Sequence, residues 1–149
     1  DFGIEARLSV LKRSNASVEP DNGFQQGGII LRSITGKGEN NFIFSLGTGG
    51  NSVPKYFLKI TTAGKSKTRV NKTDSMSAWL RIEKRGNQIK VLKKPDEASS
   101  WIKVEEYALP WLNDDLEAGF SVMARFAGDG PKQKPDMKAI FSAIKTSGL

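Results

Sequence analysis

The 149-residue sequence contains no cysteine and no histidine. Their absence excludes a cysteine nucleophile, a Ser-His-Asp triad, a thiolate zinc site and any metal held by imidazole. The chain also lacks a run of roughly 18 consecutive apolar residues, the length that a membrane-spanning helix needs. We therefore predict no membrane span and none of the catalytic chemistries that depend on a thiol or an imidazole.

A signal peptide is also missing from the first residues, DFGIEARLSV, which lack a basic start followed by an apolar stretch. Because the chain does not begin with Met, we expect it to be a processed form or part of a larger parent protein. Its hydrophobic content of 38% and charged content of 26% are ordinary for globular proteins, and its length suits one domain over residues 1–149.

The net charge of +7 favours either acidic partners or simply a well-solvated surface. Residues 64–72, GKSKTRVNK, are basic and could contact phosphate or an anionic polymer. They lack interleaved aromatic residues and any nucleic-acid-binding signature. The sequence therefore predicts a solvated loop here and no nucleic-acid partner.

Apolar residues repeat with period two through most of the chain, which is the signature of β-strands. Helical periodicity is nearly absent, and PWLNDDLEAG is predicted to be a loop or a single turn. Gly86-Asn87 suits a two-residue type II′ hairpin turn. The pattern predicts an all-β, two-sheet antiparallel β-sandwich with strands at 2–10, 28–34, 41–46, 56–62, 78–85, 88–93, 101–107, 119–127 and 137–145.

The more apolar face of each predicted strand supplies the expected core. These residues are Phe2, Ile4, Leu8, Ile30, Phe42, Phe44, Leu58, Leu80, Ile82, Val91, Val122 and Ile140.

Several segments occur in an order found in one known family: GGIILRS, AWLRIEKRGNQIKV, SSW, GFSVMARFAG and MKAIFSAIK. The chain resembles the concanavalin A-like lectin/glucanase superfamily, in particular its laminin-G-like bacterial jelly rolls. The matching positions are Arg32, Arg81, Gly86, Asn87, Trp101 and Gly119. Two features depart from the family: the turn KKPDEASSW lacks an intact Asp-Gly pair, and one or two N-terminal strands are missing. Either this sequence omits those strands, or another element fills that edge of the sheet.

The resemblance implies a secreted carbohydrate-binding or adhesion-type module, extracellular or in the cell envelope, whose partner is a polysaccharide or glycan. Some relatives are glycanases that carry Glu-x-Asp-x-x-Glu on one strand, and this chain has no such string. Glu105 and Glu106 are adjacent and point to opposite faces, whereas Asp114 and Asp115 lie in a predicted loop. We therefore expect no hydrolysis, with a glycoside hydrolase or lyase, or a structural, protein-binding domain, as the alternatives.

A concave sheet face could bind the glycan through an aromatic plane and charged donors. Trp79 and Arg81 lie two residues apart on one strand and share a face, which predicts an accessible binding surface that Arg32, Arg125 and Lys59 could join. The alternative is structural: Trp79 packs beneath a loop or in a buried layer, and Arg81 pairs with Glu83 or Glu105.

Trp101 and Trp111 are expected to serve packing. A calcium ion could be held by loop oxygens from Asp114, Asp115, Asp136 and the GDG at 128–130. EF-hand spacing is absent and Asp-Gly is a routine turn, so no cofactor is expected and calcium stays an alternative.

Overall fold

The computed structural model describes residues 1–21, 23–35, 38–124 and 136–149. The described chain folds into β-strands and one short 3-10 helix, with no α-helix. The strands are β1 (Phe2–Lys12), β2 (Gln25–Ser33), β3 (Asn41–Thr48), β4 (Lys55–Thr62), β5 (Lys65–Lys72), β6 (Ser77–Arg85), β7 (Gln88–Lys94), β8 (Ile102–Ala108), β9 (Leu116–Ala124) and β10 (Met137–Gly148), and the 3-10 helix is η1 (Pro110–Asn113).

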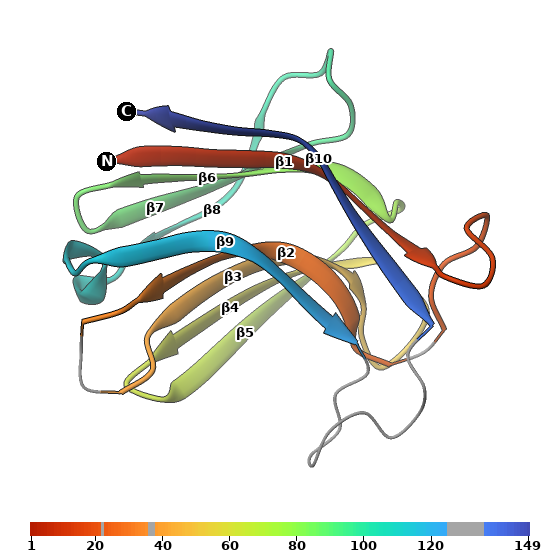
Figure 1. The fold of residues 1–149 in the computed structure, drawn as a ribbon, viewed down its shortest axis with the longest axis horizontal. Coiled ribbons are helices and arrows are strands. Elements are labelled where there is room, and N and C mark those ends of the chain that lie inside the picture. Colours follow the sequence, from red (N-terminus) through yellow and green to blue (C-terminus); the bar gives the residue numbers. More distant parts are fainter. Residues whose placement is uncertain (22, 36–37, 125–135) are drawn as a thin grey trace.

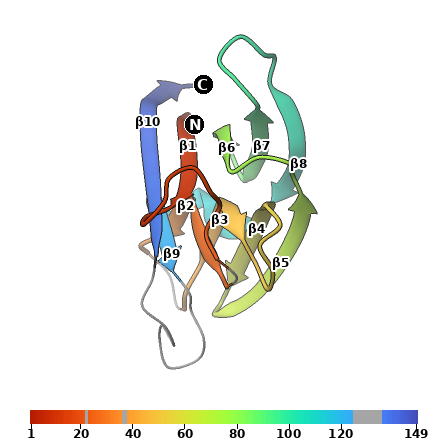
Figure 2. The ribbon, with the colours of Figure 1, turned by 90° about the vertical axis from the view of Figure 1, so that its right-hand side faces the viewer.

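Two five-stranded antiparallel sheets pack face to face, so the predicted β-sandwich is confirmed (Figure 1). Sheet A has the strand order β10-β1-β6-β7-β8, and sheet B has the order β5-β4-β3-β2-β9. The two sheets are seen end-on in Figure 2. Strand β10 lies beside β1 and fills the sheet edge that the sequence left without an N-terminal strand.

The core between the sheets contains the alternate residues of each central strand. From sheet A come Leu8, Leu80 and Ile82, and from sheet B come Phe42 and Phe44, all at most 1% exposed. The 3-10 helix adds Trp111 and Leu112, and the Trp111 indole N–H donates to Thr62 Oγ1 at 3.3 Å. Trp111 is therefore a packing residue, as predicted.

All nine predicted strands are present, although residues 125–127 of the strand predicted at 119–127 lie outside the described residues. Residues 65–72 are strand β5 rather than the predicted solvated loop. This strand is exposed and basic, so it carries no apolar alternation that could reveal it. A tight turn at Ala63 (φ 48°) and Gly64 (φ 78°) folds it back against β4. Hairpin geometry and backbone pairing, not burial, form this edge strand.

The Gly86-Asn87 turn has the predicted conformation, because Arg85 pairs directly with Gln88 and Gly86 has a φ of 54°. A left-handed φ at the first turn position is what a type II′ turn requires. The predicted single turn at PWLN is the 3-10 helix.

Three core predictions need correction, and they lie on edge strands or on an outer face. Val122 is 59% exposed on edge strand β9, and Ile140 is 38% exposed on edge strand β10. Ile30 is half-buried on the outer face of sheet B, whereas Phe2, at the end of β1, is partly buried and packs against the core as predicted. Period two shows which residues share a face, but it does not show whether a second layer covers that face.

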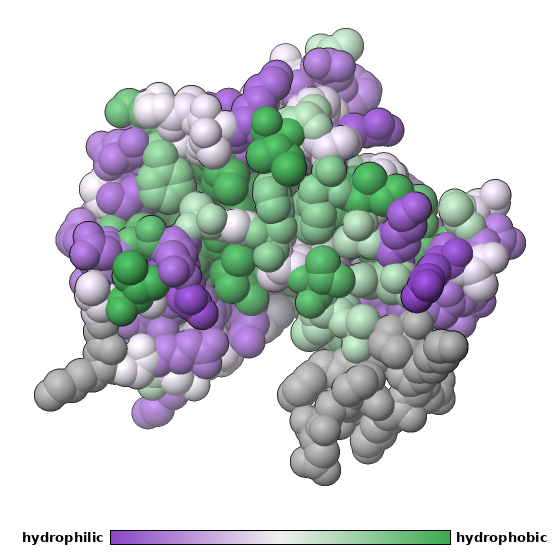
Figure 3. All heavy atoms as spheres, viewed as in Figure 1, coloured by the Kyte–Doolittle hydropathy of each residue, from purple (hydrophilic) through white to green (hydrophobic). Residues whose placement is uncertain are grey.

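Apolar side chains gather along the side of the sandwich where β9 and β10 form the two sheet edges (Figures 1 and 3). Phe120 of β9 and Phe141 of β10 stack across this side, with ring centroids 4.6 Å apart. This aromatic pair joins the two edges, while Val122 remains exposed beside it.

Within the residues that the structure describes, no helix is long and apolar enough to cross a bilayer.

Truncation of Leu80, which is 1% exposed, should destabilise the fold strongly. We expect Leu80→Ala to lower the free energy of unfolding by about 2 to 5 kcal/mol, because it leaves a cavity in a packed core. Urea denaturation measures the change. Ile140→Ala is the control: at an exposed edge position it should cost clearly less, and equal losses for the two variants would contradict the assigned facing of β6 and β10.

Candidate functional site

The outer face of sheet A carries Trp79 and Arg81, and there the expectation of an accessible tryptophan is wrong. Trp79 is only 4% exposed. The ammonium group of Lys94 lies 5.0 Å from the centre of the Trp79 ring and 5.0 Å from that of the Trp101 ring. Lys145 approaches the Trp79 ring from β10 at 5.9 Å. Lysine side chains and the neighbouring strands thus enclose an indole that a sugar would need to reach.

The Arg81 side chain also contacts neighbouring side chains of sheet A. Its guanidinium contacts Glu5 at 2.8 Å and Glu83 at 2.9 Å, and it lies 5.7 Å from the Trp101 ring centre. The structural alternative, in which Arg81 pairs with Glu83, is therefore confirmed. Trp101 is half-buried and joins this network, which agrees with its predicted packing role.

A hollow of about 590 Å³ adjoins this network over β6, β7 and β8, and its lining is dominated by charged side chains of both signs. Its charged members are Glu83, Arg85, Lys90, Lys103 and Glu106. Charges of opposite sign alternate across the strands here, an arrangement typical of a solvated sheet face. Among its described lining residues, the half-buried Trp101 is the one aromatic side chain.

Sheet B is curved, and its outer face is concave. Figure 1 shows β2 and β9 arching, with their ends bending away from sheet A. Glycines allow the backbones of β2 and β3 to come unusually close: a Cβ on Gly28 would lie 2.3 Å from the Phe44 carbonyl oxygen, and one on Gly47 would lie 2.1 Å from that of Gln25. Glycine at such positions permits a tight bend that no other residue could adopt without a clash.

The concave face holds a hollow of about 400 Å³, which we name the sheet B hollow. Its walls are mainly apolar, with a few polar groups and one lysine. The lining residues are Phe24, Gln26, Ile43, Ser45, Phe57, Lys59, Thr68, Ser121, Val122 and Met123. They come from β2, β3, β4, β5 and β9 and from Phe24 just before β2.

Two buried side chains form a polar patch in this lining. Ser45 Oγ donates to Gln26 Oε1 at 2.9 Å, and Gln26 Nε2 donates to the Thr48 carbonyl at 3.4 Å. Gln26 is 6% exposed and Ser45 is 3% exposed, so both are held by their surroundings. Gln26 and Ser45 therefore form a closed, buried hydrogen-bonded pair that supports the floor of the hollow between its apolar walls.

Phe24 lies at one end of the hollow, where hydrogen bonds of the residues before and after it in the sequence fix its position. Gln25 Nε2 donates to the Asp21 carbonyl at 2.9 Å, and Thr48 Oγ1 donates to the Gly23 carbonyl at 2.7 Å. The ring itself remains 44% exposed, so it is available to a ligand.

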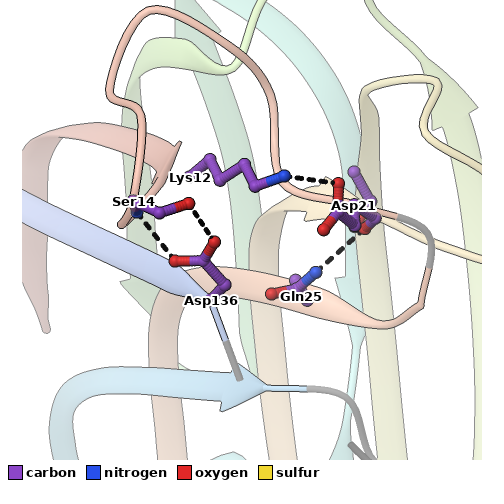
Figure 4. Close-up of polar contacts among 6 residues, drawn as sticks. Lys12, Ser14, Asp21, Gln25 and Asp136 are labelled. Carbon is purple, nitrogen blue, oxygen red and sulfur yellow. Dashed lines mark hydrogen bonds and ion pairs between the residues drawn. The ribbon is translucent and has the colours of Figure 1, made fainter. Parts of the chain in front are cut away.

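A polar cluster fixes the loop that precedes Phe24 (Figure 4). Lys12 Nζ contacts Asp21 Oδ1 at 2.9 Å, and the backbone N–H of Ser14 donates to Asp136 Oδ1 at 2.7 Å. Hydrogen bonds from the Ser14 hydroxyl and backbone lower the pKa of Asp136 from its ordinary value. The cluster ties the β1–β2 loop to the start of β10.

The five residues predicted to bind ligand are divided between two faces. Trp79 and Arg81 lie on sheet A, whereas Lys59 lines the sheet B hollow. Arg32 lies farther along the same face of sheet B, where it forms an ion pair with Glu117. Arg125 lies outside the described residues.

Sequence reasoning missed most of the hollow, including Phe24, Gln26, Ser45 and Phe57. Small residues at outward strand positions, such as Gly28 and Gly47, were a usable signal, because they leave a sheet face unfilled. Phe24 lies between predicted strands and has no periodic pattern to mark it.

The residues considered for calcium do not form a metal site in the described part of the chain, where no group of three or more acidic side chains is placed to hold an ion. Asp114 accepts a hydrogen bond from Ser33, and Asp136 accepts those from Ser14. The GDG at 128–130 lies outside the described residues.

No family model and no curated protein matches this sequence. Solved structures do share the fold. A functionally unknown protein from Saccharomyces cerevisiae has a TM-score of 0.75 and 15% identity, over 99% of this chain and 69% of that chain. A mutant of the GH43 protein BlXynB from Bacillus licheniformis has a TM-score of 0.73 and 12% identity, over 99% of this chain and 27% of that chain.

A third similar structure is the CBM2 module of the evolved Dit of Lactobacillus casei BL23 phage J-1. Its TM-score is 0.52 and its identity 9%, over 97% of this chain and 59% of that chain. At these identities the similarities show a common β-sandwich fold.

The glycine dependence of the concave face can be tested by adding one methyl group. We expect Gly28→Ala to lower the free energy of unfolding by about 1 to 3 kcal/mol, because its Cβ would overlap the β3 backbone. Gly119→Ala on β9 is the matched control, since a Cβ there meets nothing within 4 Å. Urea denaturation compares the two, and similar stabilities would show that β2 and β3 do not require this close approach.

Proposed function

We propose that this chain is a non-catalytic carbohydrate-binding or adhesion-type module that holds its glycan in the sheet B hollow. The observation that carries the proposal is the lining of the hollow, which combines the exposed Phe24 ring and apolar walls with the accessible polar side chains of Lys59, Thr68 and Ser121. Binding pockets for small ligands typically combine apolar and aromatic walls with a few well-placed polar groups. A sugar ring matches such a lining, because it has an apolar C–H face and polar hydroxyls at its rim.

Binding is favoured over hydrolysis by the absence of acidic side chains from the described lining of this site. Most glycoside hydrolases need two carboxylates that flank the scissile bond. Within the described chain, the lining of the sheet B hollow contains no Asp or Glu, and Glu117, farther along the face, is paired with Arg32. A glycoside hydrolase or lyase, or a domain that binds only protein, is supported less well.

The similar structures support the same proposal. Two of them belong to proteins named for GH43 and CBM2, which are carbohydrate-associated. The sandwich and the order of its segments also support membership of the concanavalin A-like superfamily and its laminin-G-like jelly rolls. We propose that the module is one domain of a larger extracellular or cell-envelope protein; the chain matches 27% of the GH43 protein's length.

The exposed Phe24 ring gives a direct test. We expect Phe24→Ala to weaken binding of the oligosaccharide that a glycan array identifies by about 1 to 3 kcal/mol, the range for an aromatic anchor. Isothermal titration calorimetry measures the affinity. Phe24 is 44% exposed, so the variant should keep its melting temperature.

Ile102→Ala is the control, because Ile102 is a 54% exposed apolar residue on β8 of the other sheet. It should bind the oligosaccharide like the wild type. If Phe24→Ala binds as tightly as Ile102→Ala, or if the array shows no glycan bound at all, the proposed function is wrong.

A further inference from the structure

Lys59 is the only charged residue in the described lining of the sheet B hollow. It lies on β4, where it pairs with Ile43 of β3 on one side and Thr68 of β5 on the other. These three residues all line the hollow. Lys59 thus lies on the strand next to the β5 edge of the concave face, between the apolar Ile43 and the hydroxyl-bearing Thr68.

The charge of Lys59 is not committed to any carboxylate in the part of the chain that the structure describes. Ion pairs occur elsewhere, for example between Arg32 and Glu117 on the same face and between Arg81 and Glu5 on sheet A. Lys59 takes part in no such pair with any residue that the structure describes. Lys55, which lies on the same strand two positions before Phe57, also has a polar partner, because its ammonium group donates a hydrogen bond to Asn51.

A half-buried cation between apolar walls has lost part of its hydration, and among the described residues it has no neighbouring carboxylate to offset that loss as a paired charge does. Its attraction for an anion is stronger there than at a fully exposed position, because less water screens it. A carboxylate on the ligand would supply the missing partner through a charge-assisted hydrogen bond. Thr68, its register partner on β5, supplies a hydroxyl donor beside it, and Ser121 supplies another across the hollow on β9.

We infer that the sheet B hollow selects acidic glycans, with the carboxylate of a uronic acid residue bound to Lys59. This inference rests on the proposed function and names the class of sugar that the site takes. The apolar walls face the carbohydrate ring, while Lys59 faces its carboxylate. The lining offers no described carboxylate that would repel such a ligand.

An array of uronic-acid oligosaccharides paired with their carboxyl-reduced counterparts tests the inference, because each pair differs only in charge. We expect the acidic member of at least one pair to bind about tenfold or more tightly, as loss of one hydrogen bond to a charged group predicts. The preference should shrink as salt is raised.

Three variants then locate the charge. Lys59→Gln should abolish the preference for the acidic member, and Lys59→Arg should retain most of it, since arginine keeps the charge. Lys90→Gln is the matched control, because Lys90 is also a half-buried lysine on an outer sheet face, but on sheet A. It should leave the preference unchanged.

The outcomes separate this inference from the proposed function. If neutral oligosaccharides bind as well as acidic ones, or bind alone, the inference is wrong and glycan binding stands. A preference that survives in Lys59→Gln but is lost in Lys90→Gln would overturn it and place the anion on sheet A. If neither acidic nor neutral glycans bind, both the inference and the proposed function are wrong.

Discussion

The close approach of β2 and β3 at Gly28 and Gly47 is the constraint on which the concave face depends. A side chain at either position would overlap the backbone of the neighbouring strand. The pair can therefore bend only because both residues lack a Cβ. That bend, together with the small outward residues Ser45 and Ser121, leaves the outer face of sheet B unfilled and produces the hollow.

The two outer faces of the sandwich satisfy their side chains in different ways. On sheet A, Arg81 pairs with Glu5 and Glu83, and Lys94 lies over Trp79 and Trp101. The charged and aromatic side chains of that face therefore interact with one another. On sheet B, apolar walls surround Lys59, and its charge has no carboxylate partner among the described residues. The difference in pairing, more than the difference in shape, distinguishes the face that can accept a ligand.

The sequence was sufficient for the fold because alternation along a strand directly reports which residues share a face. It correctly grouped Leu80 with Ile82 and opposite Trp79, and Leu80 and Ile82 are fully buried between the sheets. It could not show that Trp79 is enclosed on the outer side, because that depends on Lys94 and Lys145 from other strands. Strand β5 escaped prediction for a related reason: it is held by pairing with β4, and its side chains are exposed and polar. The site was predictable only in part, through Lys59, since the position of a strand within its sheet is decided by long-range pairing.

The central claim is that ligand binds to the outer face of sheet B and not to that of sheet A. Backbone and indole chemical shifts, followed by ¹H–¹⁵N correlation NMR during titration with the tightest-binding oligosaccharide, test it most directly. The account predicts that amides of Gln26, Ser45, Lys59 and Ser121 shift, while the indole N–H signals of Trp79 and Trp101 stay in place. Shifts confined to the two indoles and their neighbours on β6 and β7 would contradict it.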